Sequence, residues 1–290
     1  MVLVLNPSKR GADRARRGLV RALAAAGSPP PGVLMTTVAE PGAAQAQAAI
    51  RHGADLVVVG GGDGTLREVA GVLAGTGVEL GVLPLGTANL FARNVHIPTR
   101  LEGAISAALT AEARPVDLGR ATLDGVTHPF LVVAGIGNDA TTVLSTHAVA
   151  KASLGWIAYL ESGARHLLAP HRAYTLSRDG AASSDVVAWT ILAANCGRLP
   201  AGLTVVPDAR VDDGLLDLLV ASPRGLEWAV AAYHGFAGTP DRARGLDYSR
   251  VRSVVIEPAV PTAVQLDGDT FPTVHRMEVT VDPGALLVRY

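Results

Sequence analysis

Val57-Val58-Val59-Gly60-Gly61-Gly62-Asp63-Gly64-Thr65 is the stretch of sequence that decides the fold. The almost wholly apolar run over residues 55–59 predicts a central parallel strand that is buried on both faces. The glycines after it indicate a turn, and residues 66–74 are expected to form the following helix. A strand, a glycine turn and a helix in this order predict one βα unit of a parallel sheet.

The same alternation extends in both directions over the first third of the chain. Short β-branched runs predict strands at residues 2–5, 33–37 and 80–84. Alanine-rich stretches predict helices at residues 14–26, 45–52, 89–94 and 101–111. This βαβα order predicts an α/β N-terminal, Rossmann-like domain with a doubly wound sheet.

The pattern changes near residue 116, after which strand-like runs dominate. They are expected at residues 120–123, 130–134, 173–178, 186–194, 215–221, 251–257, 263–266 and 277–281, with helices at 150–168 and 226–236. We therefore predict a nucleotide-binding α/β domain over residues 1–120 and a β-rich sandwich C-terminal domain over residues 121–290. The last strand, at residues 285–290, is able to return to the first domain.

Composition restricts the classes of function. The 290 residues suffice for two domains, and a net charge of -1 gives no reason to expect a nucleic-acid partner. The longest apolar runs fall short of the ~18 residues that a membrane-spanning helix needs. Cys196 is the only cysteine, which excludes an intramolecular disulfide and fits a reducing cytoplasm. The first residues read as a strand rather than a signal peptide, so we expect a cytoplasmic protein.

The glycine turn is expected to bind phosphate. Glycines let the backbone approach an anion closely and adopt positive φ angles, and the dipole of the following helix adds to the attraction. Asp63 cannot contact phosphate itself, but it could bind Mg²⁺ through water or orient a nucleophile. Thr65 is expected to cap the helix. The third glycine of the dinucleotide-binding pattern and the lysine of a P-loop are both missing, so a plain tight turn remains an alternative.

Two other polar turns follow predicted strands. They are Asn6-Pro7-Ser8-Lys9-Arg10-Gly11 and Pro84-Leu85-Gly86-Thr87-Ala88-Asn89. In a parallel sheet all three turns lie at the carboxyl ends of strands, where ligands bind. Folding requirements alone explain such a coincidence poorly.

These residues resemble the diacylglycerol-kinase catalytic superfamily, which includes bacterial lipid kinases, sphingosine kinases and ceramide kinases. Besides the three turns, the resemblance rests on Val116-Asp117-Leu118-Gly119, Ala134-Gly135-Ile136-Gly137, Asp212-Asp213-Gly214-Leu215-Leu216-Asp217 and Leu266-Asp267-Gly268-Asp269. It covers nearly the whole chain in the family's order. NAD kinases and phosphofructokinases share the Gly-Gly-Asp-Gly-Thr turn, but the later motifs are not expected in them.

The resemblance implies an ATP site between the two domains. The residues that match nucleotide-binding positions are Asn6, Pro7, Ser8, Lys9, Arg10, Thr37, Gly61, Gly62, Asp63, Gly64, Thr65, Glu68 and Thr87. Arg14, Arg16, Arg17 and Arg21 could also face phosphate or an anionic membrane, although a solvated helix face explains most of them.

The resemblance also implies catalytic and metal residues. Asp267 matches the proposed general base, and Asp63 and Asp269 complete the catalytic set. Asp213 would supply a carboxylate to a Mg²⁺ site, with backbone oxygens from Arg210 and Leu215, and Asp117 would link this metal to the active site through water. On spacing alone, ordinary β-turns are the favoured interpretation of Asp267-Gly268 and Asp213-Gly214.

Two positions depart from the family pattern. Leu90 stands where many relatives have an aspartate, so one acidic residue of the metal–water network is missing. Asp269 stands where relatives usually have glutamate.

The sequence therefore predicts an ATP-dependent, Mg²⁺-requiring lipid kinase, resembling diacylglycerol kinase, that transfers a phosphoryl group directly to a lipid alcohol. A soluble kinase acting on NAD or a sugar phosphate, and a weakly active nucleotide- or lipid-binding protein, remain the alternatives. The apolar helix expected at residues 154–168, with Trp156, Tyr159 and Leu160, would be a substrate gate or peripheral membrane contact, or else pack in the core. A homodimer is left open.

Overall fold

The computed structural model describes residues 1–138, 140, 169–198, 204–239 and 242–290. It divides the chain into two compact units. We call Met1–Leu118, Val211–Asp213 and Asp282–Tyr290 the α/β unit, and Gly119–Arg210 with Gly214–Val281 the β unit. The predicted helix at 150–168, with its membrane-gate residues, lies outside the described residues.

The α/β unit is built on a parallel sheet, as predicted. Its strands follow the order β2 (Gly32–Met35), β1 (Val2–Leu5), β3 (Leu56–Gly61) and β4 (Glu79–Pro84). All neighbouring pairs run parallel. The end of β16 (Met277–Arg289) adds a further parallel strand beside β4 through Leu287 and Val288. The carboxyl ends of β1, β3 and β4 therefore lie side by side, which places the three polar turns at one edge of the sheet.

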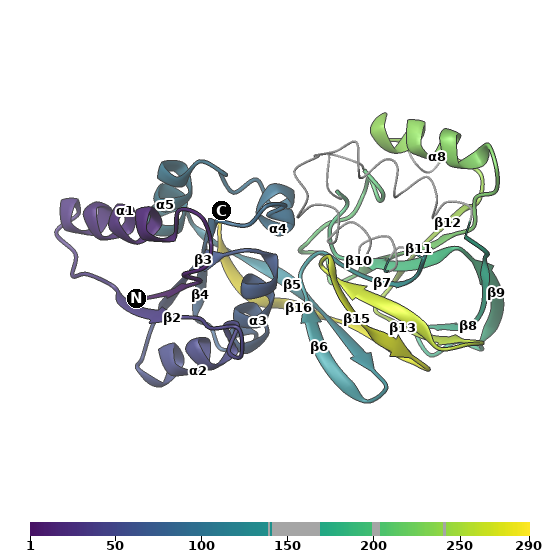
Figure 1. Cartoon of the computed structure of the whole chain (residues 1–290), viewed down its shortest axis with the longest axis horizontal. Coiled ribbons are helices and arrows are strands. Elements are labelled where there is room, and N and C mark those ends of the chain that lie inside the picture. Colours follow the sequence, from purple (N-terminus) through teal and green to yellow (C-terminus); the bar gives the residue numbers. More distant parts are fainter. Residues whose placement is uncertain (139, 141–168, 199–203, 240–241) are drawn as a thin grey trace. The chain divides into compact units, whose positions relative to one another are not determined.

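Helices cover both faces of this sheet (Figure 1). On one face lie α1 (Ala12–Ala25) and α5 (Leu101–Thr110), and on the other lie α2 (Ala43–Arg51) and α3 (Asp63–Leu73). The sequence of α1 explains its position, because Ala12, Ala15, Leu19 and Leu23 recur every three or four residues and are all buried. A short helix, α4 (Leu90–Asn94), follows the turn after β4.

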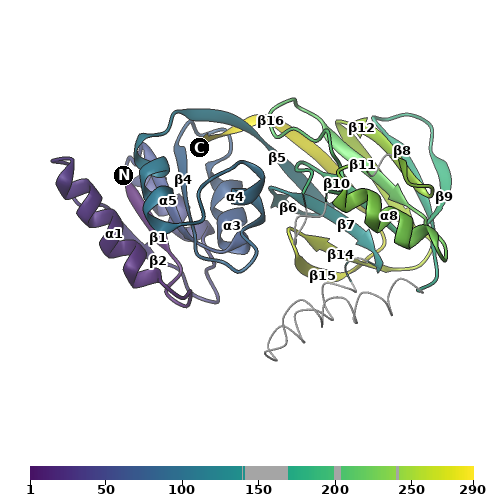
Figure 2. The ribbon, with the colours of Figure 1, turned by 90° about the horizontal axis from the view of Figure 1, so that it is seen from above.

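The β unit is the predicted sandwich. One sheet is antiparallel, in the order β12 (Leu246–Val251), β11 (Leu216–Ala221), β10 (Thr190–Ala194), β7 (Val133–Gly137), β14 (Thr262–Leu266) and β15 (Asp269–Val274). The other holds the start of β16 with β13 (Ser253–Pro258), β8 (Arg172–Arg178) and β9 (Ser184–Ala188). A further antiparallel pair is formed by β5 (Ala113–Leu123) and β6 (Val126–Phe130). Figure 2 shows these strands from a second direction, with α8 (Glu227–Phe236) beside them.

A continuous apolar core joins the strands of the β unit. Its members include Ile136, Leu218 and Leu266 from one sheet and Tyr174 and Val254 from the other. Each strand contributes every second residue to this core, as expected for the inner faces of a β-sandwich.

Five features of the strand prediction were wrong. The single run at residues 186–194 is split into β9 and β10, because Trp189 leaves the ladder and donates its N–H to the carbonyl of Ala221 (2.7 Å). Conversely, the runs at 277–281 and 285–290 form one strand, β16, that passes through Gly284 at a φ of +56°. Strands β6, β12 and β15 were missed, since only one residue of each is buried. Within the described ranges, no helix has both the length and the apolar content needed to cross a bilayer.

Candidate active site

The glycine turn leads from β3 directly into α3. Gly62 is the N-cap, with an extended backbone (φ −98°, ψ −176°), and the helix begins at Asp63. Two expectations were therefore wrong: none of the glycines from Gly60 to Gly64 has a positive φ, and Thr65 lies inside the helix rather than capping it. Helix geometry leaves the first backbone N–H groups of α3 without a partner in the helix, so they point out of its N-terminus. This is the arrangement expected of an anion site.

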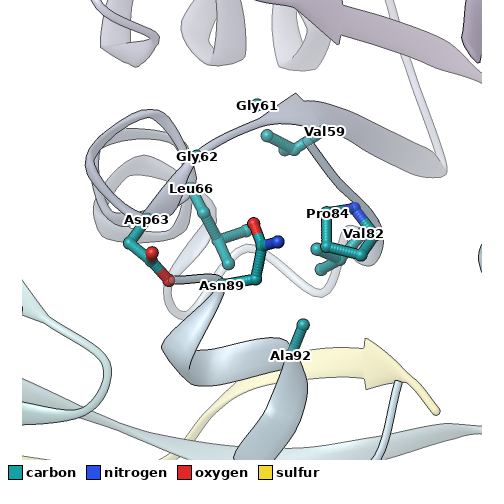
Figure 3. A pocket seen from close by; sticks show the side chains of 9 residues that line it. All are labelled: Val59, Gly61, Gly62, Asp63, Leu66, Val82, Pro84, Asn89 and Ala92. Carbon is teal, nitrogen blue, oxygen red and sulfur yellow. The ribbon is translucent and has the colours of Figure 1, made fainter. Parts of the chain in front are cut away.

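Close backbone approach, rather than backbone conformation, explains the glycines. A Cβ atom on Gly61 would lie 2.8 Å from the Cβ of Thr65. A Cβ on Gly86, in the turn after β4, would lie 2.8 Å from the Cα of Gly62. The two turns thus press against each other at Gly86, a position that admits no side chain. Figure 3 shows the crevice beside them, of about 10 Å³, with residues from β3, α3, β4 and α4 around it.

Asn89 fixes the shape of the second turn. Its side-chain oxygen accepts the N–H of Gly86 and its amide nitrogen donates to the carbonyl of Gly86, both at 2.8 Å. The residue is buried and adopts a left-handed conformation (φ 47°, ψ 51°), which asparagine tolerates better than most residues. Thr87 is left exposed at the tip of the turn. We assigned no role to Gly86 or Asn89 from the sequence, although a glycine three residues before an asparagine is a recognisable turn signal.

Asp63 has a structural role in the site. One carboxylate oxygen accepts the N–H of Leu90 at 2.7 Å, so Asp63 caps the N-terminus of α4. Burial raises the pKa of Asp63 above its usual value, and the N–H groups of Leu90, Phe91 and Asn89 oppose that shift. Leu90, one of the two positions that depart from the diacylglycerol-kinase pattern, is itself buried.

Substitution of Asp63 by Asn is expected to preserve the fold. Asparagine caps a helix as well as aspartate does, whereas Asp63→Ala loses the cap and should cost about 1 kcal/mol of unfolding free energy. Because the folded-state pKa is raised, the folded protein holds the Asp63 proton more tightly than the unfolded chain does. Its contribution to stability is therefore full below about pH 4, the unfolded pKa, and is lost as pH rises through the folded pKa.

Denaturant unfolding of wild type, Asp63→Asn and Asp63→Ala at several pH values measures both effects. The stability of Asp63→Asn relative to wild type should improve as pH rises from 3 to 7. A relative stability independent of pH would show that the carboxyl is not desolvated.

The turn after β1 packs on the glycine turn. The amide nitrogen of Asn6 donates to the hydroxyl of Thr65 at 3.2 Å, and the oxygen of Asn6 accepts the N–H and hydroxyl of Ser8 at 3.1 and 2.7 Å. Lys9 extends toward Gly62: its Nζ lies 3.5 Å from where a Cβ of Gly62 would stand. The structure thus brings the predicted residues Asn6, Ser8 and Lys9 together with the glycine turn, and leaves Pro7 and Arg10 exposed.

Two other predicted nucleotide residues have partners of their own. Thr37 lies in the exposed loop after β2, where its hydroxyl accepts the N–H of Glu40 at 3.0 Å. Glu68 is half-buried on α3 and lies 3.8 Å from the buried guanidinium of Arg67. Arg67 is not among the residues predicted from the motifs, although its position directly after the predicted phosphate turn is a signal for it.

A larger hollow of about 310 Å³ lies on the α1 side of the first turn. Lys9, Arg14 and Arg17 give it a basic wall, and its other lining residues are Leu5, Pro7, Gly11, Ala12, Asp13 and Met35. The remaining basic residues of α1 behave as a solvated face: Arg16 lies 3.9 Å from Asp13, and Arg21 is exposed. The hollow combines apolar walls with positive charge, which suits a flat apolar group that carries phosphate.

Asp267 is held by the backbone. It forms a two-residue hairpin turn with Gly268 between β14 and β15, and both residues have positive φ angles (51° and 86°). The predicted turn is therefore confirmed. Its buried carboxylate accepts the N–H groups of Leu131, Val132 and Val133 at 2.8, 2.8 and 3.0 Å. Asp269, two residues later, is exposed at the start of β15.

Cys196 is a buried thiol. Its sulfur lies 3.5 Å from the carbonyl oxygen of Leu131. Burial raises the pKa of this thiol, and the nearby carboxylate of Asp267 raises it further. Cys196 is therefore held as an unreactive thiol.

The residues predicted to bind Mg²⁺ would all do so through oxygen atoms, from a carboxylate or from backbone carbonyls. Arg210, Asp213 and Leu215 belong to the short loop before β11, and Asp117 lies on β5. The N–H of Asp117 donates to the carbonyl of Val211 (2.7 Å), and its buried carboxylate accepts the N–H of Gly284 (2.6 Å). Among the described residues, no three His, Cys, Asp or Glu side chains gather as a metal cluster. One carboxylate plus carbonyls and water is nevertheless a donor set that Mg²⁺ accepts.

Comparison with known proteins agrees with both halves of this description. Residues 1–121 match the family model for the diacylglycerol kinase catalytic domain, and residues 131–290 match the YegS C-terminal NAD kinase beta sandwich-like domain. The chain is similar to a "Probable lipid kinase YegS-like" from Pseudomonas aeruginosa strain UCBPP-PA14, with 35% identity covering 83% of this chain and 78% of the relative. A protein of the same name from Xanthomonas campestris pv. campestris is 34% identical, covering 76% and 74%.

Solved structures show the same fold. The structure of "a putative diacylglycerol kinase" from Bacillus anthracis str. Sterne is 26% identical, covers all of this chain and 94% of the other, and has a TM-score of 0.79. Fold and family together define a kinase with a diacylglycerol-kinase catalytic domain. The chain belongs to the YegS-like family of lipid kinases.

Proposed function

We propose that this enzyme transfers the γ-phosphoryl group of ATP to the hydroxyl of a long-chain lipid alcohol such as diacylglycerol. The observation that carries the proposal is the contact of Gly62 with Gly86 beside the amino group of Lys9. Backbone N–H groups at the start of α3 and the amino group of Lys9 therefore lie close together. The glycine contact beside them leaves no room for a further side chain. A triphosphate is the ligand that such a cradle fits.

The hollow lined by Lys9, Arg14 and Arg17 supports ATP as the donor. It adjoins the cradle through Lys9, and its apolar walls include Leu5 and Met35. We assign the nucleoside to this hollow and the phosphates to the glycine turn. Thr37 and Thr87, exposed in loops after β2 and β4, are proposed to complete the nucleotide contacts, and Glu68 to hold Arg67 in place.

For proton acceptance we favour Asp269 over Asp267. Protonating Asp267 would disrupt its bonds with three backbone N–H groups, whereas Asp269 is exposed at the start of β15. In the proposed step the lipid oxygen bonds to the γ-phosphorus as the bond to the β-phosphate oxygen breaks. The hydroxyl proton passes to Asp269, and ADP leaves. Asp267 acts as a positioning residue that holds the hairpin.

Mg²⁺ is the proposed metal, because Asp213 and the carbonyl oxygens of Arg210 and Leu215 are all hard donors. When bound, a magnesium ion neutralises phosphate charge. Asp117 is proposed to hold this loop through its bond to Val211 and to order water near it. Asp63 accepts the N–H of Leu90 and so fixes the start of α4. This also fixes the preceding turn, whose Gly86 contacts Gly62.

The proposed setting is the cytoplasm, where ATP is supplied and the thiol of Cys196 stays reduced. A lipid acceptor requires at least transient contact with a membrane from that side. We propose no nucleic-acid partner, given the net charge of -1, and the assembly, monomer or homodimer, is to be measured by light scattering.

Radiolabelled ATP with a panel of acceptors tests the function. The panel holds diacylglycerol, a sphingoid base, NAD and a sugar phosphate, with Mg²⁺ present. Label in a lipid product is expected. Label in NAD or the sugar phosphate would identify a soluble kinase, and ATP binding without any labelled product would identify a binding protein.

Replacing Lys9 by Met should weaken ATP binding by about ten- to a hundredfold. The substitution keeps the apolar stem and removes a charged donor worth about 1.5–3 kcal/mol. Arg21→Met is the matched control, since it removes one positive charge from the exposed face of α1. Isothermal titration calorimetry measures both affinities. Equal weakening in the two variants would assign the effect to overall charge.

A further inference from the structure

The outward face of α8 is apolar along its length. Leu226, Val230 and Tyr233 recur at positions i, i+4 and i+7, and 86%, 46% and 69% of their surfaces are exposed. Ala229 lies exposed between them. The sequence has no Asp, Glu, Lys or Arg between Glu227 and Asp241. A surface helix of a globular domain normally turns a charged face to water, and α8 does not.

The inward face is already occupied by the β unit. Trp228 packs edge-on against Trp189, with ring centroids 4.8 Å apart, and the carbonyl of Gly235 accepts the N–H of Thr204 at 3.2 Å. The exposed residues are therefore not a core face that has been left open. They form a second apolar surface on an anchored helix, and such a surface marks an interaction site.

We propose that this face of α8 docks the enzyme on an anionic lipid bilayer. The inference rests on the proposed function, because it supplies the contact through which a lipid kinase reaches its substrate. Leucine, valine and tyrosine suit the boundary between headgroups and acyl chains. Figure 1 shows α8 at the surface of the β unit.

Charge at both ends of the helix favours a bilayer over another protein chain as the occupant. Arg224 precedes α8, and Arg242 and Arg244 follow it, and all three side chains are exposed. Glu227 accepts the N–H of Arg224 at 2.9 Å and so is turned back toward the start of the helix. Arginines flanking an apolar strip complement the phosphate headgroups of an anionic bilayer.

Vesicle flotation of the full chain tests the docking face. Wild type is expected to float with phosphatidylglycerol–phosphatidylcholine vesicles, and Val230→Glu or Tyr233→Glu should lower the partition coefficient by at least about tenfold. Val187→Glu is the matched control: Val187 is also in the β unit and is 54% exposed, but lies on β9. Arg224→Gln combined with Arg244→Gln should reduce the preference for phosphatidylglycerol. Wild-type partitioning by both glutamate variants would overturn the proposal.

A site-specific probe separates docking from misfolding. Cys196 is buried, so Val230→Cys and the control Val187→Cys can each be labelled at one position with an environment-sensitive dye. Only the dye at 230 should shift to shorter wavelength and be quenched by brominated lipid. Equal responses at both positions would overturn the proposal, as would light scattering showing that Val230→Glu dissociates a dimer.

Activity assays distinguish the docking role of α8 from the proposed kinase function on which it rests. The α8 variants should lose activity on substrate in vesicles while retaining it on substrate in detergent micelles. Equal loss in both would overturn the docking role. If wild type docks but phosphorylates no lipid, the proposed function fails and the docking face stands.

Discussion

Asp269→Asn is expected to lower phosphoryl transfer by about 10²–10⁴-fold without changing ATP affinity. The substitution removes the exposed carboxylate that we assign as proton acceptor and keeps its size. Asp269→Glu should retain activity, because it restores the acid that the family pattern usually has there. Rapid-quench measurement of labelled lipid, with ATP affinity measured separately, checks both variants.

Asp267→Asn is the matched comparison two residues away. An amide offers one oxygen where the carboxylate accepts three N–H groups, so about 2–4 kcal/mol of stability should be lost. Activity per folded molecule should fall far less than in Asp269→Asn. The opposite pattern, a stable Asp267→Asn without activity and an active Asp269→Asn, would return the base role to Asp267.

Gly86→Ala is expected to abolish most nucleotide binding. The added Cβ would meet the backbone of Gly62 at 2.8 Å, and neither backbone can yield without moving a turn. A shift of about 1 Å in such a cradle costs about 10² in kcat/KM, and the overpacking costs about 1–3 kcal/mol of stability.

Gly32→Ala is the control for this substitution. Its new Cβ would make only an ordinary contact, at 3.5 Å from Val2, on the edge strand β2. Calorimetry with ATP and thermal unfolding together measure the two variants. Unchanged ATP affinity in Gly86→Ala would show that the contact between the turns does not form the phosphate site.

The fold was largely predictable because its periodicities are strong. The apolar run before Gly60 and the alanine-rich helices predict a parallel sheet, and the succession of strand-like runs after residue 116 predicts the sandwich. Where the prediction was wrong, backbone contacts and backbone conformation decide the outcome. Trp189 breaks one expected strand in two, and Gly284 lets β16 continue where two strands were expected.

The site was only partly predictable for a similar reason. The motifs place Asn6, Lys9 and the glycine turn at one sheet edge, and the structure brings them together. The sequence cannot show that Asp63 caps α4 or that Asp267 is held by three N–H groups. These hydrogen bonds join segments that are far apart in the chain, so only the three-dimensional structure identifies the partners.

Direct transfer of the phosphoryl group from ATP to a lipid is tested by counting both products. Wild type with radiolabelled ATP, Mg²⁺ and diacylglycerol in mixed micelles should yield one labelled lipid for each ADP. Asp269→Asn should form both products slowly and in the same ratio. Release of ADP and free phosphate by wild type without labelled lipid, from this or any other acceptor alcohol, would contradict the assignment of lipid kinase activity.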